Sequence, residues 1–142
     1  MITHLKFLIF FLTVICSKGF SQIKFACFEN DKNPELKISV SFDKNERAKF
    51  VKYKGQKDSI PLYYSKIIKS ENPGGIPAVY WEKIYLEKVN GKVTGEYSFT
   101  NAGTYQLDVT YTRKKDKKEF YFQIIESTVS AIDGAFREKP CF

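Results

Sequence analysis

Apolar and polar residues alternate along most of the chain after residue 22, and many of the apolar positions are aromatic or β-branched. A period of two is typical of strands that turn one face to a core and the other to water. The segment from Tyr105 to Tyr111 is the cleanest example. The strands expected from this pattern lie around residues 25–27, 36–42, 48–54, 60–68, 79–89, 93–99, 105–111 and 120–124.

Turn signals separate the expected strands. Asn90-Gly91 lies between two alternating segments and predicts a hairpin, because both residues tolerate the positive φ of a type I′ turn. The segment Ser70 to Pro77 holds two prolines and two glycines and predicts a loop. The lysine-rich run from Arg113 to Lys118 predicts a solvated hairpin tip.

About eight antiparallel strands with short turns predict an all-β domain, either a closed barrel or a two-layer sandwich. The pattern does not decide between these two architectures. Near the C-terminus, Val129, Ile132 and Phe136 are spaced three and four residues apart, which predicts a short helix between Thr128 and Lys139.

The first 21 residues differ from the rest of the chain. About ten mainly apolar residues, Phe7 to Cys16, fit the hydrophobic region of a signal peptide and fall short of the roughly 20 needed to span a bilayer. Gly19 and Ser21 supply the small residues that precede a cleavage site. We therefore expect a signal peptide over residues 1–21 and a single periplasmic or secreted domain over residues 22–142, with no membrane span. Lipidation of Cys16 is an alternative that Ile15 disfavours, since lipoprotein processing requires a small residue there.

The charge of the chain argues against nucleic acid as a partner. The formal net charge is +7, and loss of Lys6 and Lys18 with the signal peptide lowers it to +5. The basic residues are mixed with acidic ones, and the densest basic run is short and interrupted by Asp116. This arrangement lacks the basic stripe of a nucleic-acid-binding module.

Two cysteines remain after the signal peptide, Cys27 near the new N-terminus and Cys141 next to the C-terminus. In an oxidising compartment they predict one disulfide that closes nearly the whole domain into a ring. Free buried thiols are the alternative. Two thiols without a histidine make a metal site unexpected.

The catalytic chemistry open to the domain is limited. The only histidine, His4, lies in the predicted signal peptide, which excludes Ser-His-Asp and Cys-His arrangements and histidine-based zinc sites in the mature protein. A pair of carboxylates remains a formal alternative. The candidates are Glu82, Glu87, Glu96, Asp108 and Glu119. Because they alternate with apolar residues, we expect most of them on the solvated faces of strands. Neither an enzyme nor a cofactor is expected.

One expected strand, residues 79–89, has large apolar residues on both alternating faces. Such a strand either lies between two covered layers or exposes a patch for a partner. Burial in the core is the simpler interpretation of Trp81, whereas the functional one makes it the anchor of a binding surface beside the Pro/Gly loop. The candidate partner-binding residues are Asn72, Gly74, Gly75, Tyr80, Trp81 and Lys83.

Three segments carry a resemblance to a known family, namely Phe25-Ala26-Cys27, Leu36 to Asp43 and Lys54-Gly55. Together they resemble the start of the periplasmic and membrane-bound inhibitors of c-type lysozyme. The resemblance implies a small exported β-barrel with a disulfide from the first strand to the C-terminal region. It also implies that the loop from Asn72 to Tyr80 enters the lysozyme cleft, although no serine directly precedes the glycine here. The second half, from Asn90 to Phe120, resembles small uncharacterised exported bacterial proteins, which implies no function.

These observations predict a non-enzymatic exported binding protein, such as an inhibitor or immunity factor directed against a secreted hydrolase. The alternative is an envelope or carbohydrate-associated module that uses exposed aromatic residues to stack on sugars. The expected partner is accordingly another protein or a cell-envelope glycan.

Overall fold

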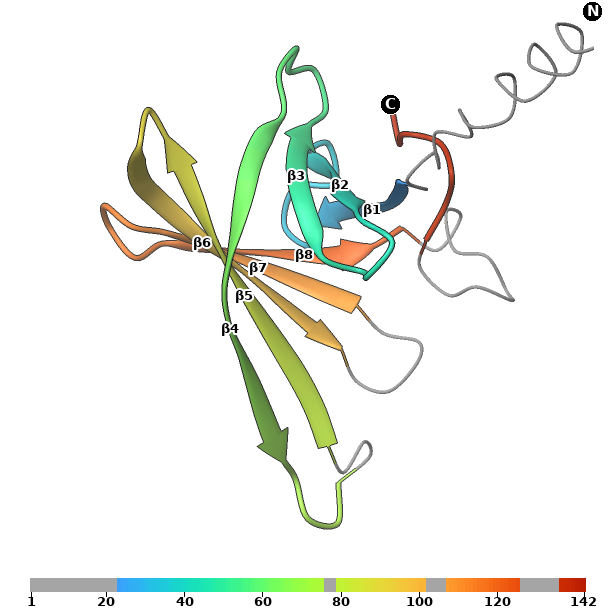
Figure 1. Ribbon diagram of the computed structural model, residues 1–142, viewed down its shortest axis with the longest axis vertical. Coiled ribbons are helices and arrows are strands. Elements are labelled where there is room, and N and C mark those ends of the chain that lie inside the picture. Colours follow the sequence, from blue (N-terminus) through green and yellow to red (C-terminus); the bar gives the residue numbers. More distant parts are fainter. Residues whose placement is uncertain (1–22, 76–78, 102–106, 126–135) are drawn as a thin grey trace, which may run out of the picture.

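The computed structural model describes residues 23–75, 79–101, 107–125 and 136–142, which form a closed barrel of eight antiparallel strands (Figure 1). The strands are neighbours in chain order, and β8 pairs with β1 to close the barrel. They are β1 (Lys24–Asn30), β2 (Lys37–Phe42), β3 (Ala48–Tyr53), β4 (Ile60–Glu71), β5 (Val79–Val89), β6 (Lys92–Asn101), β7 (Leu107–Arg113) and β8 (Glu119–Ile124). The predicted all-β class and the number of strands are confirmed. Of the two architectures that the sequence left open, the structure is the closed barrel and not the two-layer sandwich.

Two sequence predictions fall largely on other parts of the chain. The predicted signal peptide, residues 1–21, lies outside the described residues, as do residues 128–135 of the predicted C-terminal helix. The described remainder of that segment, residues 136–139, contains no helix, and Arg137 instead forms an isolated bridge with Phe25 of β1. Within the described ranges, no helix has the length and apolar character needed to cross a membrane.

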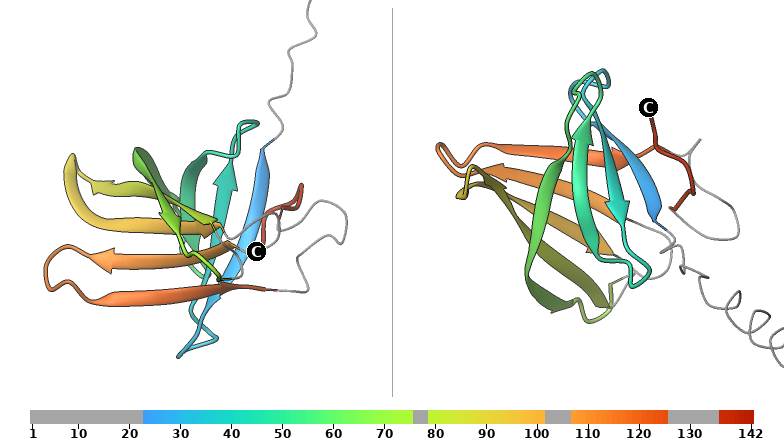
Figure 2. Two further views of the ribbon diagram at one scale, coloured as in Figure 1. Left: turned by 90° about the horizontal axis from the view of Figure 1, so that it is seen from below. Right: turned by 45° about the horizontal axis from the view of Figure 1, so that its top comes forward.

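The barrel consists of two groups of strands joined by short ladders. β1–β3 form one group and β4–β8 the other, and the strands of the two groups cross in space (Figure 2). The β3–β4 ladder contains only the pairs Phe50↔Pro61 and Val51↔Ile60. By contrast, β4 and β5 pair from Leu62↔Glu87 to Glu71↔Val79. Pro61 stands at this junction because it lacks an N–H donor and is tolerated only where a ladder ends.

The core fills the barrel with the inward-facing residues of each strand, as the period of two predicts. The buried core cluster consists of Ala26, Phe28, Ile38, Val40, Phe42, Ala48, Val51, Leu62, Tyr85, Tyr97, Phe99, Val109, Tyr111 and Phe122. Edge-to-face aromatic contacts run through one part of it, with ring centroids 5.9 Å apart for Phe42 and Phe99 and 5.3 Å apart for Tyr85 and Phe99. This geometry adds a modest attraction to the area that the rings bury.

A disulfide ties the C-terminal segment to the barrel. Cys27 of β1 is bonded to Cys141, with 5.8 Å between the two Cα atoms, which confirms the predicted pairing. The segment lies along the outside of β1 (Figure 2), where Phe25 N–H donates to the Arg137 carbonyl oxygen at 2.7 Å. In the chain-entropy account, closing a loop of this length stabilises the fold by up to roughly 4.7 kcal/mol.

The turns follow the sequence signals. Asn90 and Gly91 have φ angles of 50° and 75°, and Val89 pairs directly with Lys92 around them, so the predicted two-residue hairpin is confirmed. The lysine-rich tip between β7 and β8 is held by Arg113, whose guanidinium donates to both carboxylate oxygens of Asp116, at 3.0 and 2.6 Å.

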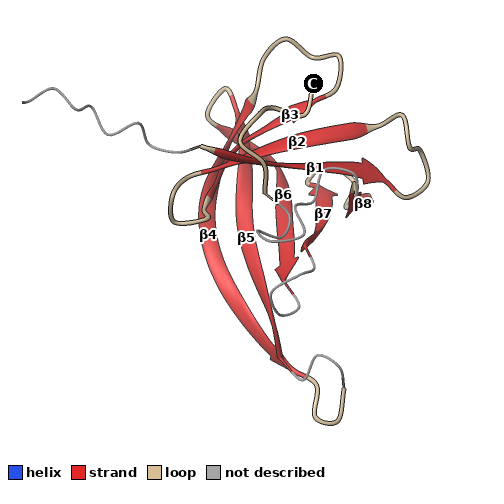
Figure 3. Ribbon diagram, turned by 90° about the vertical axis from the view of Figure 1, so that its right-hand side faces the viewer, coloured by secondary structure: helices blue, strands red, loops and turns tan. Residues whose placement is uncertain are grey.

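The outer parts of β4 and β5 extend beyond the barrel as a hairpin, which points downward in Figure 1 and again in Figure 3. The hairpin is two strands wide beyond Trp81, where the pairing of β5 with β6 ends. We call residues 63–75 and 79–83 the arm. Every residue of β4 from Tyr63 to Lys69 is exposed, so neither face of this strand is covered there. The arm is the part of the fold that positions the predicted partner-binding residues.

Candidate functional site

The tip of the arm is a tight turn at Asn72. The Gly75 N–H donates to the Asn72 carbonyl oxygen at 2.8 Å, and Gly74 adopts a φ of +80°, which a residue without a Cβ adopts easily. A Cβ on Gly75 would lie 2.0 Å from the side-chain amide nitrogen of Asn72, so any other residue there would force the Asn72 side chain to move. Three of the six predicted site residues therefore shape the tip.

Trp81 lies on one face of the arm and is 43% exposed, so the interpretation that places it in the core is wrong. Its neighbour across the strands is Lys69, whose ammonium lies 5.8 Å from the centroid of the indole ring and 2.8 Å from the Glu71 carboxylate. Lys83 follows Trp81 on the same face, half-buried and paired with Ile67 and Phe99. The structure thus brings Trp81 and Lys83 together.

Tyr80 differs from Trp81 in both orientation and exposure. Adjacent residues of a strand point to opposite faces, so Tyr80 lies on the other face of the arm, where it is half-buried opposite Ser70. The six predicted residues consequently divide among the tip and two faces.

The sequence analysis missed the apolar residues of β4 that belong to this surface. Of the ten large hydrophobic residues that are exposed among the described residues, five lie on the arm, which makes it the main exposed apolar region. These are Tyr63, Tyr64, Ile67, Ile68 and Trp81. The pairs Tyr-Tyr and Ile-Ile were the available signal, because adjacent apolar residues in a strand place one side chain on each face.

β4 also has a free edge along the arm. Beyond Pro61, β5 is its only ladder partner among the described residues. The backbone N–H and C=O groups on the opposite edge therefore face outward over most of the strand. A free edge of this kind is a template for pairing with an extended segment of another chain.

Inside the barrel, by contrast, one carboxylate is buried. Glu87 is 6% exposed and accepts hydrogen bonds from the hydroxyls of Thr94 at 2.5 Å, Tyr111 at 3.0 Å and Tyr97 at 3.3 Å. Tyr97 also shares a hydrogen bond of 2.8 Å with Tyr53. The expectation of a solvated face is wrong for Glu87, because its side of β5 faces the interior.

This network changes the acidity of its tyrosines. Burial, reinforced by the neighbouring Tyr53 and Glu87, raises the pKa of Tyr97 well above its usual value. Burial and the Glu87 carboxylate also raise the pKa of Tyr111. Tyr111 packs over Gly95, where an added Cβ would lie 2.2 Å from its ring. The hydroxyls are consequently held as neutral donors to one carboxylate.

Two other strand carboxylates also bond to hydroxyls, whereas Glu29 and Glu71 form ion pairs with Lys37 and Lys69. Glu82 accepts a hydrogen bond from Ser98, and Asp108 accepts one from Tyr121. Burial, together with this carboxylate, raises the pKa of Tyr121 to about 12. In the described part of the chain, no side-chain hydrogen bond joins two carboxylates across a cleft.

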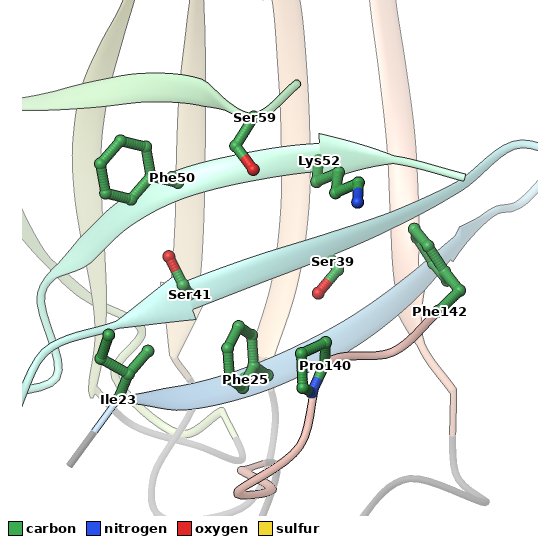
Figure 4. A pocket seen from close by; sticks show the side chains of 9 residues that line it. All are labelled: Ile23, Phe25, Ser39, Ser41, Phe50, Lys52, Ser59, Pro140 and Phe142. Carbon is green, nitrogen blue, oxygen red and sulfur yellow. The ribbon is translucent and has the colours of Figure 1, made fainter. Parts of the chain in front are cut away.

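A second surface feature lies on the outer face of β1–β3 (Figure 4). It is a hollow of about 260 Å³ between aromatic walls, with serine hydroxyls and Lys52 around its floor. Sequence alternation predicts Ser39 and Ser41 on a water-facing side of β2, yet Ser39 is only 6% exposed and the Ser41 hydroxyl is inaccessible. The prediction is wrong there because the C-terminal segment covers that face.

Among the described residues, no group of three or more histidine, cysteine, aspartate and glutamate side chains is arranged to hold a metal ion. Comparison of the chain with protein-family models, curated proteins and solved structures found no match. The arm, the buried network around Glu87 and the hollow on β1–β3 are the features of the described structure that bear on function.

Proposed function

We propose that the protein is a non-enzymatic exported binding protein whose arm docks into a secreted hydrolase, in the manner of an inhibitor or immunity factor. The observation that carries the proposal is the exposure of Trp81, at 43%, on a hairpin that extends beyond the barrel. Exposed aromatic residues beside long cationic side chains are characteristic of interface hot spots. Export is supported by the Cys27–Cys141 disulfide, which is consistent with a non-cytoplasmic protein.

The shape of the arm suits insertion into a cleft. Beyond Trp81 it is two strands wide and leads into a tight turn, so its outermost part presents a narrow edge rather than a flat face. The apolar side chains of β4 lie on both faces, which allows contact with both walls of a cleft at once. The free edge of β4 offers backbone hydrogen bonds in addition.

The charge of the arm favours a glycoside hydrolase such as a lysozyme as the target. Lys66, Lys69 and Lys83 lie along the arm together with Glu82 and with Glu71, which is paired with Lys69, so the arm carries one net positive charge. The cleft of a glycoside hydrolase contains a pair of carboxylates. Opposite charges raise the rate of encounter and fix the orientation of the complex. The same target class is the one implied by the resemblance to the inhibitors of c-type lysozyme.

A non-enzymatic role is supported by the way in which the buried carboxylate is used. All three hydroxyls that bond to Glu87 stabilise the interior of the barrel, and the described hydrogen-bond partners of Glu87 are these hydroxyls rather than a second acid. A paired-carboxylate mechanism requires two acids on either side of a reacting bond.

The proposal is tested with the purified protein and a panel of lysozymes and other secreted glycoside hydrolases. We expect at least one hydrolase to be inhibited and to form a complex that calorimetry detects. Trp81→Ala should weaken that complex by at least about thirtyfold, which corresponds to a hot-spot loss of about 2 kcal/mol. Phe50→Ala is the matched control, because Phe50 is an aromatic residue with 47% exposure that lies on another face. Full activity of every hydrolase, or equal effects of the two variants, contradicts the proposal.

A further inference from the structure

The hollow on β1–β3 is a trough built by the register of three strands. Ser41 in the central strand pairs with Phe25 on one side and with Phe50 on the other, so a small residue lies between two aromatic ones. Neighbouring strands are about 4.8 Å apart, which places the two phenylalanine backbones roughly 9.6 Å apart. One ring with van der Waals contact on both sides requires about 7–8 Å between its walls. The trough is therefore wide enough to admit a single ring.

The floor of the trough has hydrogen-bonding capacity that the protein does not use. Ser39, Ser41 and Ser59 line the hollow, and Figure 4 shows the two β2 serines between the aromatic walls. Within the described ranges, none of these hydroxyls has a hydrogen-bond partner, although Ser39 is only 6% exposed. Lys52 of β3 is paired with Ser39 of β2, two residues along from the pair of Phe50 and Ser41. It forms no ion pair with the described residues. The Ser41 hydroxyl is inaccessible, so Ser39 and Ser59 supply the hydroxyls that a ligand in the hollow can bond.

The disulfide fixes one end of this trough. Pro140 and Phe142 line the hollow, and Cys141 between them is bonded to Cys27 of β1. Phe142 is 41% exposed and would otherwise belong to a free chain end. The covalent bond therefore keeps an aromatic side chain beside Lys52, as Figure 4 shows.

From these features we propose that the hollow binds one pyranose ring of an acidic saccharide. The faces of a pyranose carry C–H groups that pack on aromatic walls, and its edge carries hydroxyls that both donate and accept, as serine hydroxyls do. Lys52 pairs with the carboxylate of the sugar. A purely apolar ligand fits worse because it would leave the serine hydroxyls without partners. The volume of about 260 Å³ lies below the range of about 300–1,000 Å³ typical of sites for larger ligands, which limits the site to one ring.

This site is separate from the arm, so its test does not depend on the proposed function. The disulfide-bonded protein is titrated with glucuronic acid and N-acetylmuramic acid, and with glucose and N-acetylglucosamine as their neutral counterparts, while backbone amide signals are followed by NMR. We expect shifts confined to residues around Phe25, Ser39 and Lys52. The acidic sugars should bind about two- to fivefold more tightly, as a partly exposed ion pair allows.

Three variants separate the contributions. Phe50→Ala should weaken the binding of all four sugars about five- to tenfold, because it removes one aromatic wall. Lys52→Gln should remove only the preference for acidic sugars, and Trp81→Ala on the arm should change nothing. Absence of saccharide-induced shifts, shifts at another surface, or an equal effect of Trp81→Ala overturns the proposal. Binding of adenosine monophosphate in place of the sugars also overturns it, since that result would identify a nucleotide site.

Discussion

The two halves of β5 share one alternating pattern but have opposite environments. Trp81, Lys83, Tyr85 and Glu87 follow one another on the same face of the strand. Trp81 is 43% exposed, whereas Tyr85 and Glu87 are 1% and 6% exposed. The inner half faces the opposite wall of the barrel, while the outer half extends past Pro61, where the pairing of β4 with β3 ends. Alternation assigns a residue to a face, and the neighbouring strands decide whether that face is covered.

The largest difference in stability between the two halves should appear when Tyr85 in the inner half and Trp81 in the outer half are each replaced by alanine. Tyr85→Ala removes a core ring and leaves the Ala48 N–H, which donates to the Tyr85 hydroxyl at 3.2 Å, without a partner. We expect it to lower the free energy of unfolding by about 3–5 kcal/mol. Trp81→Ala should lower it by less than about 1 kcal/mol, since exposed cation–π contacts contribute little. Urea unfolding measures both, and similar losses would contradict the contrast.

The disulfide joins β1 to the C-terminal segment and does not involve the arm. Replacement of Cys27 and Cys141 by alanine should lower the free energy of unfolding by about 2–5 kcal/mol. Hydrogen exchange in the double variant should accelerate first around β1 and residues 136–142, with arm amides changing only as much as global stability requires. A selective effect on the arm would show that the two regions are coupled.

Removal of the buried carboxylate of Glu87 tests how much the inner half of β5 contributes to stability. Glu87→Gln replaces a charged acceptor of three hydroxyl donors and should lower the free energy of unfolding by about 1.5–3 kcal/mol. Glu82→Gln is the control on the opposite face of the same strand, where one serine donates, and should change it by less than about 1 kcal/mol. If thermal or urea unfolding showed equal losses of stability for the two variants, the buried network would contribute no more than the exposed contact.

The tyrosines of the network predict sensitivity to alkali. Their folded pKa values lie above the ordinary value of 10, so below that pH both folded and unfolded states keep the protons and the full contribution to stability is present. As the pH rises above 10, the unfolded state releases protons that the folded state retains, and the free energy of unfolding falls. Urea midpoints measured from neutral to strongly alkaline pH should show this decline. Tyr111→Phe should make it shallower, whereas Tyr63→Phe on the arm should not.

The smallest effect concerns Trp81 itself, the only tryptophan of the chain. Because its indole is 43% exposed, acrylamide should quench its fluorescence in the folded protein. Unfolding should shift its emission only slightly. Resistance of the folded protein to quenching would place the ring in a covered position and remove the basis of the proposed arm interface.

Most of the strand pattern was predictable because it depends on local alternation and on turn residues. Asn90-Gly91 marked a hairpin, and the two remaining cysteines marked a disulfide. The six candidate site residues included Trp81 and Lys83 of the arm but not the exposed apolar residues of β4. The Tyr-Tyr and Ile-Ile pairs place apolar side chains on both faces of β4, but that neither face is covered follows only from the end of the β3–β4 ladder at Pro61.

The sequence by itself predicted which residues form strands, which side chains share a face, and that Cys27 and Cys141 are candidates for a disulfide. Only the tertiary structure decided closure into a barrel, the exposure of Trp81, the burial of Glu87 and the covering of Ser39 by the C-terminal segment. The physical reason is that alternation is a property of a single strand. Burial depends on chain segments distant in sequence, which pack against one face and not against the other.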